Sequence, residues 1–256
     1  YMLHRPNNIK PLDVPLHASE SRFEQNYGMS PDILINNSIE SDYFIKRGWS
    51  TSSVHAVGSL GYNEKWLKFL LKIDSIKKEN FSSDKSLKIF VPLRDSHWYY
   101  LTEDNYNYLL NSLAIIFQKF SSYSFVLKLH PRQSPKKIKK LFSKYNNVSF
   151  STESPFMLAL KADLTLGLWS SASTDSIAVG TPALEFHKHE IIHSQVINTG
   201  EKLISILEYL ELCEGFDDLN TLEDYIKGLD KEKLRALHKK QYQKLLKIFD
   251  LGTDYK

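Results

Sequence analysis

An alternation of short apolar runs with amphipathic helical segments limits what this chain can fold into more than any other feature. Its clearest unit is residues 162–186, ADLTLGLWSSASTDSIAVGTPALEF. The apolar run at 164–168 predicts a strand, and a polar turn containing Ser170 and Ser171 follows it. The next segment predicts a helix that stops at Gly180, after which a second apolar strand begins. Strand, turn, helix and strand form one βαβ unit.

The same alternation extends over most of the chain after residue 86. Apolar runs predict strands at 87–93, 125–129 and 148–150, and a helical apolar period predicts helices at 103–120, 134–145 and 155–162. Strands separated by such helices form parallel sheets with right-handed crossovers and with helices on both faces. The sequence therefore predicts an α/β fold built on a parallel sheet.

Segments outside this region predict further elements. Short strands are expected at 31–38 and 54–59, an amphipathic helix at 63–77 and a terminal helix at about 231–249. The charged, serine-rich stretch 78–85 is the best linker candidate.

Composition narrows the class of protein. Of 256 residues, 42% are hydrophobic and 25% charged, which provides ample apolar material for a core. The net charge of +3 argues against nucleic-acid binding by bulk charge. The single cysteine, Cys213, excludes an internal disulfide framework and fits a reducing compartment. No apolar run reaches the roughly 18 residues of a membrane span, and no signal-peptide pattern is present. Because the chain starts at Tyr1, we expect it to be part of a longer protein.

Three polar turns follow predicted strands of the sheet, at Arg94–His97, His130–Arg132 and Ser170–Ser171. Because the carboxyl ends of parallel strands open onto one rim, we expect these turns to converge. Together they supply a guanidinium, imidazoles, hydroxyls and the amino end of a helix. That combination suits a pyrophosphate or phosphodiester.

Each of these candidates has a simpler interpretation. Ser170 or Ser171 would then only cap the following helix, and His130 would be a solvated loop residue. Pro131 favours a functional His130, because it moves the preceding residue out of the α region and holds the imidazole at the strand tip. His17 and Glu20 form the only polar pair among residues 1–30 that we keep for chemistry, with a solvated helix start as the alternative.

A metal site is a weaker hypothesis. His187, His189, Glu190 and His193 cluster in the sequence HKHEIIHS. The spacing superficially resembles the zincin motif, but this segment follows a strand directly and lacks the long apolar helix that the motif needs. We therefore expect no catalytic metal here.

The order Lys-Leu-His-Pro at 128–131, Ser-Ser-x-x-x-Asp at 170–175 and Gly-x-Pro at 180–182 resembles the C-terminal, nucleotide-binding half of GT-B glycosyltransferases. The similar enzymes build bacterial surface glycans. They include the CMP-sugar-using sialyl- and Kdo-transferases, which have an HP motif and a serine motif, and the CDP-glycerol glycerophosphotransferases. The likeness covers roughly 87–190, with a looser similarity at 31–59. It implies a Rossmann-like parallel sheet with helices on both faces, plus a partial N-terminal domain.

This resemblance implies roles for the residues at the matching positions. His130 would be catalytic, contacting the donor phosphate and assisting departure of the nucleotide, while Ser170 and Ser171 would hold that phosphate. Asp175 would be a supporting or ribose-side residue. Glu185 stands where these enzymes often place a ribose-binding carboxylate, with an exposed edge residue as the alternative.

The remaining candidates come from the other turns and from the first domain. Arg94 occupies the first rim loop, where such enzymes approach the phosphates, and Lys128, Pro131 and Arg132 flank His130. The general base of this family usually comes from the N-terminal domain, for which His17 and Glu20 are the candidates here.

The resemblance also implies a domain division. Residues 1–60 would be a remnant of the acceptor-side domain, 61–85 a linker and connecting helix, and 86–230 the nucleotide-sugar-binding domain. Residues 231–256 would form a helix that crosses back to the first domain.

The leading hypothesis is therefore a metal-independent GT-B glycosyltransferase that needs no cofactor. It would transfer a sugar, or glycerol phosphate, from a CMP- or CDP-linked donor to a bacterial surface polysaccharide (capsule or lipopolysaccharide) or glycolipid. We expect a cytoplasmic protein, whose basic terminal helix either contacts the anionic inner face of the membrane or is an ordinary solvated surface. Two alternatives stay open: a UDP-sugar 2-epimerase, and a non-catalytic nucleotide- or glycan-binding module.

Overall fold

The computed structural model describes residues 33–35, 45, 51–57, 62, 65–67, 69, 86–96, 101–131, 133–189 and 196–249. Six candidate residues of the sequence analysis lie outside these ranges: His17, Glu20, His97, Arg132, Glu190 and His193. Within the described ranges, no helix has both the length and the hydropathy that a bilayer-spanning segment requires.

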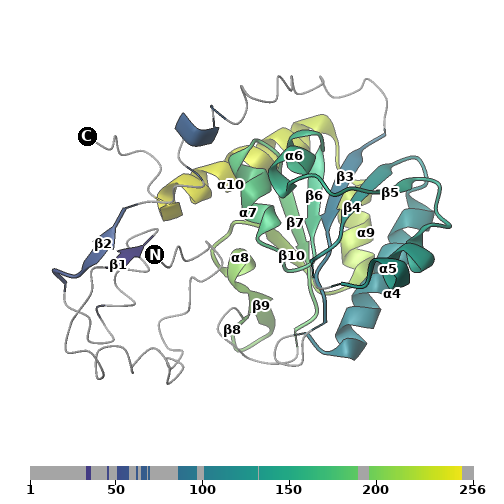
Figure 1. The fold of residues 1–256 in the computed structure, drawn as a ribbon, viewed down its shortest axis with the longest axis horizontal. Coiled ribbons are helices and arrows are strands. Elements are labelled where there is room, and N and C mark those ends of the chain that lie inside the picture. The colour runs from purple at the N-terminus through teal and green to yellow at the C-terminus, as the bar shows by residue number, and fades with distance from the viewer. Residues whose placement is uncertain are drawn as a thin grey trace.

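A six-stranded, fully parallel sheet forms the centre of the molecule (Figure 1). Its order is β10-β7-β6-β3-β4-β5. The strands are β3 (Lys88–Pro92), β4 (Ser124–Lys128), β5 (Val148–Phe150), β6 (Leu164–Gly167), β7 (Ala183–Phe186) and β10 (Glu214–Phe216). The residues of β6 and β7 are all buried, as expected for strands that are covered on both faces.

Helices cover both faces of this sheet (Figure 1). On one face lie α4 (Glu103–Lys119), α5 (Pro135–Phe142) and α9 (Leu219–Lys227), and on the other α6 (Pro155–Leu160) and α7 (Ala172–Ala178). The long helix α10 (Lys231–Phe249) packs Leu234 and Leu237 with the first group and Leu245 and Ile248 with the second.

Aromatic packing fills the space between the sheet and α4. Phe117 of α4 lies 4.7 Å from the ring of Phe125 on β4 and 5.2 Å from the ring of Phe142 on α5. All three side chains are fully buried. Tilted and edge-on ring contacts of this kind stabilise a core beyond the burial of their surface.

Small residues let α7 approach β6 closely. A Cβ atom added to Gly167 would collide with the Ser173 hydroxyl, which would have to move. The helix ends in a Schellman motif, in which Gly180 N–H donates to Ile177 O and Thr181 N–H donates to Ser176 O. Gly180 has φ +96°, a left-handed conformation that explains the predicted glycine stop.

Smaller elements surround the sheet. Strands β8 (Val196–Asn198) and β9 (Leu203–Ser205) form an antiparallel pair that leads into α8 (Ile206–Tyr209). Strands β1 (Ile33–Ile35) and β2 (Val54–Ala56) pair with each other, apart from the main sheet.

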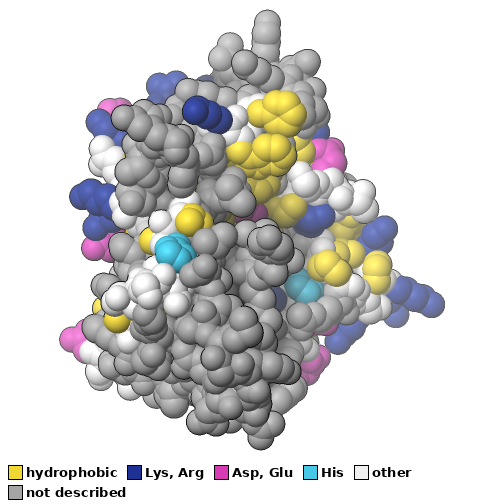
Figure 2. All heavy atoms as spheres, turned by 60° about the vertical axis from the view of Figure 1, so that its left-hand side comes forward, with side chains coloured by type: hydrophobic (Ala, Val, Ile, Leu, Met, Phe, Trp, Pro, Cys, Tyr) yellow, Lys and Arg dark blue, Asp and Glu magenta, His cyan; other side chains and the backbone are white. Residues whose placement is uncertain are grey.

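Two aromatic side chains among the helical residues 65–67 and 69 are exposed. Trp66 and Phe69 are 44% and 50% accessible, and their rings lie 5.5 Å apart. Figure 2 shows hydrophobic side chains gathered on one face of the molecule.

The predicted α/β architecture is confirmed. The strand at 148–150 and the helix at 231–249 have the predicted bounds, and the other main elements agree to within a few residues. The proposed division into domains stays a prediction.

Candidate functional site

The strand order places a switch point between β3 and β6, and we call the region at the carboxyl ends of these two strands the crevice. β3 and β6 are neighbours, but the chain leaves β3 for β4 on one side and reaches β6 only after β5. In open parallel sheets, ligands bind at the carboxyl ends of the strands where the connections diverge in this way. The crevice between the ends of β3 and β6 is therefore the candidate site.

Arg94 bridges this crevice. It follows β3, and its Nη1 donates a 2.6 Å hydrogen bond to the carbonyl oxygen of Trp169, which follows β6. The guanidinium carbon also lies 4.4 Å from the centroid of the Trp169 ring. Trp169 is almost fully buried and has φ +55°, which is rare for a bulky residue. Such local strain is often found at functional sites.

A buried glutamine ties the first two turns together. Gln133 Nε2 donates to the carbonyl oxygen of Arg94 (2.8 Å) and to the hydroxyl of Tyr106 (2.8 Å). Its Oε1 accepts from the backbone N–H of His130 (2.7 Å). The sequence analysis missed Gln133, because a single amide side chain in a loop follows no recognisable pattern.

The predicted convergence of the three turns is confirmed at the level of the sheet edge. The turns with Arg94, His130 and Ser170 follow β3, β4 and β6, which are consecutive in the sheet. Neighbouring strands are about 4.8 Å apart, so the ends of β4 and β6 are roughly 10 Å apart, with β3 between them. Shared contact of these turns with one anion stays a prediction.

The two serines differ in their local contacts. Ser171 is the residue before α7, yet its hydroxyl makes no capping hydrogen bond. The hydroxyl of Ser170 instead accepts from Ala172 N–H at 3.3 Å. The capping alternative therefore holds for Ser170 and not for Ser171, and both side chains are only partly buried at the rim.

Lys128 and Pro131 lie on the outer side of this arrangement. Lys128 ends β4, and its Nζ donates to the carbonyl oxygen of Thr152, beyond β5. This contact directs the amine away from the crevice between β3 and β6. Pro131 is exposed in the turn after His130. Their contact with a donor stays a prediction.

Asp175 of α7 accepts a 2.9 Å hydrogen bond from the hydroxyl of Tyr62. Burial, and next the Asp175 carboxylate, raise the pKa of Tyr62 well above its ordinary value, so the phenol stays neutral and donates. The contact joins a residue before the main sheet to the helix that follows the serine turn. The predicted role of Asp175 near a ribose is untested.

The exposed-edge interpretation of Glu185 is wrong. β10 pairs with the outer side of β7, so Glu185 lies in an interior strand and is fully buried. Its Oε2 accepts a short hydrogen bond from the Ser205 hydroxyl, while Oε1 has no partner among the described residues. Burial raises the pKa of this carboxyl, although His187 and Ser205 act in the opposite direction. The predicted contact of Glu185 with a ribose stays a prediction.

The histidines after β7 stack against each other. The rings of His187 and His189 are 4.6 Å apart and nearly parallel, and His187 Nε2 lies 2.9 Å from Glu208 Oε2. Burial alone would raise the pKa of Glu208, but hydrogen bonds from His187 and Lys202 outweigh it and lower the pKa. No group of three His, Cys, Asp or Glu side chains in the described ranges is arranged to hold a metal ion.

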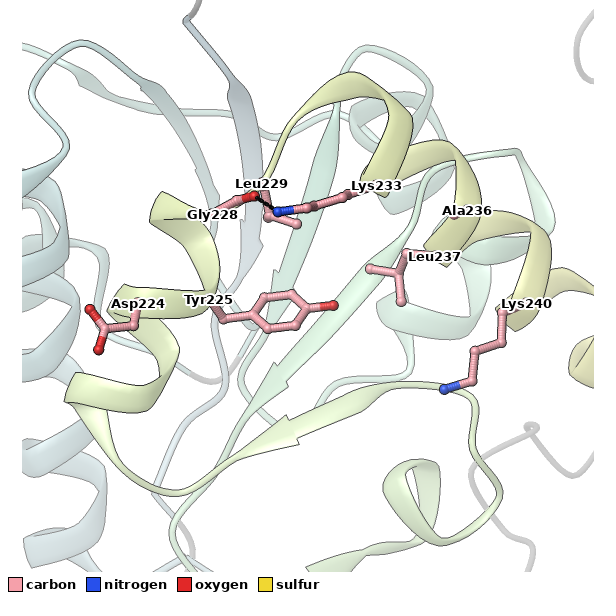
Figure 3. Close-up of a pocket in the computed structure, with 8 residues that line it drawn as sticks. All are labelled: Asp224, Tyr225, Gly228, Leu229, Lys233, Ala236, Leu237 and Lys240. Atoms are coloured by element: carbon pink, nitrogen blue, oxygen red, sulfur yellow. Dashed lines mark hydrogen bonds between the residues drawn. The ribbon is translucent and has the colours of Figure 1, made fainter.

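A second hollow lies away from the crevice, between α9 and α10 (Figure 3). It has a volume of about 530 Å³ and is lined by Tyr225, Leu237 and two lysines. Lys233 Nζ donates to Gly228 O at 2.6 Å, and Lys240 Nζ lies 2.8 Å from Glu214 Oε1. Because both ammonium groups already have partners, this hollow is a poorer anion site than the crevice.

Comparisons with known proteins identify the fold. No family model matches the sequence, and no curated protein matches it. The chain is structurally similar to UDP-GlcNAc 2-epimerase from Neisseria meningitidis bound to UDP-GlcNAc, with a TM-score of 0.57 and 17% identity over 82% of this chain and 55% of that one. It is also similar to the wall teichoic acid polymerase TagF in a soak with CDPG. Here the TM-score is 0.52 and the identity 13%, over 96% of this chain and 59% of that one.

A third similar structure is a complex of S. aureus MnaA with UDP, with a TM-score of 0.53 and 11% identity over 82% of this chain and 55% of that one. The chain thus spans little more than half the length of these proteins. At such low identity the likeness defines the fold alone. It confirms the predicted Rossmann-like parallel sheet with helices on both faces.

Proposed function

We propose that this chain is the nucleotide-binding part of a GT-B glycosyltransferase, which transfers a sugar or glycerol phosphate from a CMP- or CDP-linked donor. The observation that carries the proposal is the crevice between β3 and β6, with Arg94 on one side and the Ser170-Ser171 turn on the other. A guanidinium next to a turn that carries hydroxyls and backbone N–H groups suits the phosphate groups of such a donor. The fold shared with TagF in a soak with CDPG supports a nucleotide-activated donor.

The chemistry follows from stabilisation of the leaving group. As the bond to the transferred group breaks, negative charge grows on the departing phosphate. Arg94, the hydroxyl of Ser171 and the imidazole of His130 would be the donors at this edge, where hydrogen bonds hold the Arg94 guanidinium and the His130 backbone. Fixed donors stabilise developing charge without reorganisation of solvent. The proposed mechanism therefore needs no divalent metal, and a chelator should leave transfer unchanged.

Acceptor and location are part of the same proposal. The acceptor is a bacterial surface polysaccharide or glycolipid, and the protein works in the cytoplasm, with α10 near the anionic membrane face. Most basic residues of α10 are exposed, although Lys240 and Lys244 pair with Glu214 and Glu211. A negative result in co-sedimentation with anionic vesicles would remove the membrane contact and leave the transferase proposal intact.

Calorimetric titration with CMP, CDP and UDP, followed by a transfer assay, tests the function. We expect cytidine nucleotides to bind most tightly. His130→Ala should abolish transfer and keep the melting temperature, because His130 lies on a loop, while His55→Ala, on the exposed strand β2, should keep both. Full activity of His130→Ala would refute the assigned leaving-group role.

The epimerase alternative rests on the similarity to the Neisseria meningitidis enzyme. Binding of UDP without any binding of CMP or CDP would favour it. Nucleotide binding without any turnover by the full-length protein would favour a non-catalytic binding module.

A further inference from the structure

A continuous column of side chains stands behind Arg94. Its guanidinium packs on the Trp169 ring, and the edge of that ring meets His189, with centroids 5.0 Å apart and planes at 74°. His189 stacks on His187 at 4.6 Å and 15°, and His187 binds Glu208. We call these five residues the Arg94 column.

The far end of the column is anchored in the sheet. His187 is 1% exposed, and its backbone N–H donates to Phe216 O of β10 at 2.9 Å. Its partner Glu208 is held by Lys202 Nζ at 2.8 Å. A fully packed imidazole with a fixed backbone and a hydrogen-bonded Nε2 cannot shift without breaking these contacts. The base that supports the Trp169 ring is therefore rigid.

Trp169 holds the guanidinium by two contacts. Its ring lies under the guanidinium plane, and its carbonyl oxygen accepts from Nη1. The Trp169 backbone has φ +55°. This conformation is strained for a non-glycine residue, and the surrounding contacts must offset the strain. The Trp169 backbone conformation and the stacking of its ring therefore both favour the same position of the Arg94 guanidinium.

We propose that Trp169 is a positioning residue that holds the Arg94 guanidinium in the crevice for the phosphate groups of the donor, which are a diphosphate where the donor is CDP-linked. The inference rests on the proposed function, because it needs an anion in the crevice. A free arginine side chain loses conformational entropy when it binds a phosphate, and one that is already fixed loses less. Trp169 therefore contributes to affinity for the diphosphate and not to affinity for the nucleoside.

The test is calorimetry with three probes: CDP, inorganic pyrophosphate and cytidine. Trp169→Gly keeps the left-handed backbone accessible and removes the ring. We expect this variant to bind CDP and pyrophosphate at least 10-fold more weakly than wild type and to bind cytidine with an affinity within 2-fold of wild type. Trp169→Phe retains an aromatic face, so its affinity for CDP and pyrophosphate should fall less than 3-fold. His189→Ala keeps Trp169 but removes the ring that packs against it, and it should bind CDP and pyrophosphate about 3-fold more weakly. This variant tests the proposal even if Trp169→Gly does not fold.

A double-mutant cycle separates positioning from general damage. Arg94→Gln should strongly reduce the affinity for CDP. Adding Trp169→Gly to Arg94→Gln should reduce that affinity no further, because the ring acts only through the guanidinium. Additive losses, an equal loss for cytidine and CDP, or unchanged CDP affinity in both Trp169→Gly and His189→Ala would overturn the positioning role.

The proposed function fails in a different way. A wild-type chain that binds pyrophosphate but none of the nucleotides would overturn the nucleotide assignment and leave the role of Trp169 standing. A wild-type chain that binds neither would overturn both.

Discussion

The side-chain nitrogen Nε2 of Gln133 lies 2.8 Å from the backbone oxygen of Arg94, and through this bond two loops after different strands are held in a fixed relation. The same side chain accepts from the His130 N–H. Gln133 is 5% exposed, so water cannot replace these bonds. The mutual placement of the proposed phosphate ligand and the proposed leaving-group residue thus depends on one amide.

Gln133→Leu should therefore affect both stability and binding. The substitution removes the hydrogen bonds of Gln133 to the Arg94 carbonyl, the His130 N–H and the Tyr106 hydroxyl, and the loss of such a bond inside a protein costs about 1–3 kcal/mol. We expect the free energy of unfolding in urea to fall by about 2–4 kcal/mol and the affinity for CDP to fall about 10-fold.

Asn147→Leu is the matched control for this substitution. Asn147 Nδ2 donates to Phe117 O and Phe120 O, where α4 ends at the opposite edge of the sheet. The loss of these hydrogen bonds in Asn147→Leu should lower the free energy of unfolding by a similar amount and leave the affinity for CDP unchanged. Equal losses of affinity in the two variants would mean that Gln133 acts only through general stability.

Alanine substitutions of Ser170 and Ser171 should have different effects on stability and on CDP affinity. Ser170→Ala removes a long capping hydrogen bond, so we expect a loss of about 0.5 kcal/mol in the free energy of unfolding. Ser171→Ala removes no capping bond and should leave stability unchanged, while CDP affinity falls about 5-fold because a phosphate ligand is lost. The reverse pattern, with Ser171 needed for stability and not for binding, would exclude its proposed contact with the donor.

The sheet and its helices could be predicted because their signals are local. Apolar runs between helical segments gave strands in chain order, and Gly180 marked a helix end through its own left-handed backbone. The rim also followed from topology, since parallel strands place their carboxyl ends together.

The contacts that shape the site could not be predicted, because they join distant segments. Glu185 is interior only because β10 pairs with β7, and its hydroxyl partner Ser205 belongs to another small sheet. Gln133 acquires its role only when β4 lies beside β3. The left-handed conformation of Trp169 runs against residue preference, so no propensity argument indicates it.

The hydrogen bond from Tyr62 to Asp175 should be important for stability. Tyr62 is 2% exposed, and its hydroxyl donates to a carboxylate, an interaction worth about 1.5–3 kcal/mol. Tyr62→Phe should lower the free energy of unfolding by roughly this amount. Tyr209→Phe, at a position that is 57% exposed, is the control and should have no effect. A Tyr62→Phe variant as stable as the wild type would show that the contact adds nothing in solution.

Glu185 should make stability depend on pH. Burial raises the pKa of this carboxyl above its ordinary value of 4.5, so the folded protein binds the proton more tightly than the unfolded chain does. The folded state is favoured most by this group below pH 4.5, and the advantage falls as pH rises from there through the raised pKa.

Glu185→Gln keeps an acceptor for the Ser205 hydroxyl and cannot ionise. We therefore expect the variant to gain stability relative to wild type as pH rises above 4.5, and to gain little below it, as measured by urea unfolding between pH 4 and pH 8. A difference that stays constant over this range would mean that the buried carboxyl does not titrate there, and a gain that appears only on acidification would reverse the assigned direction.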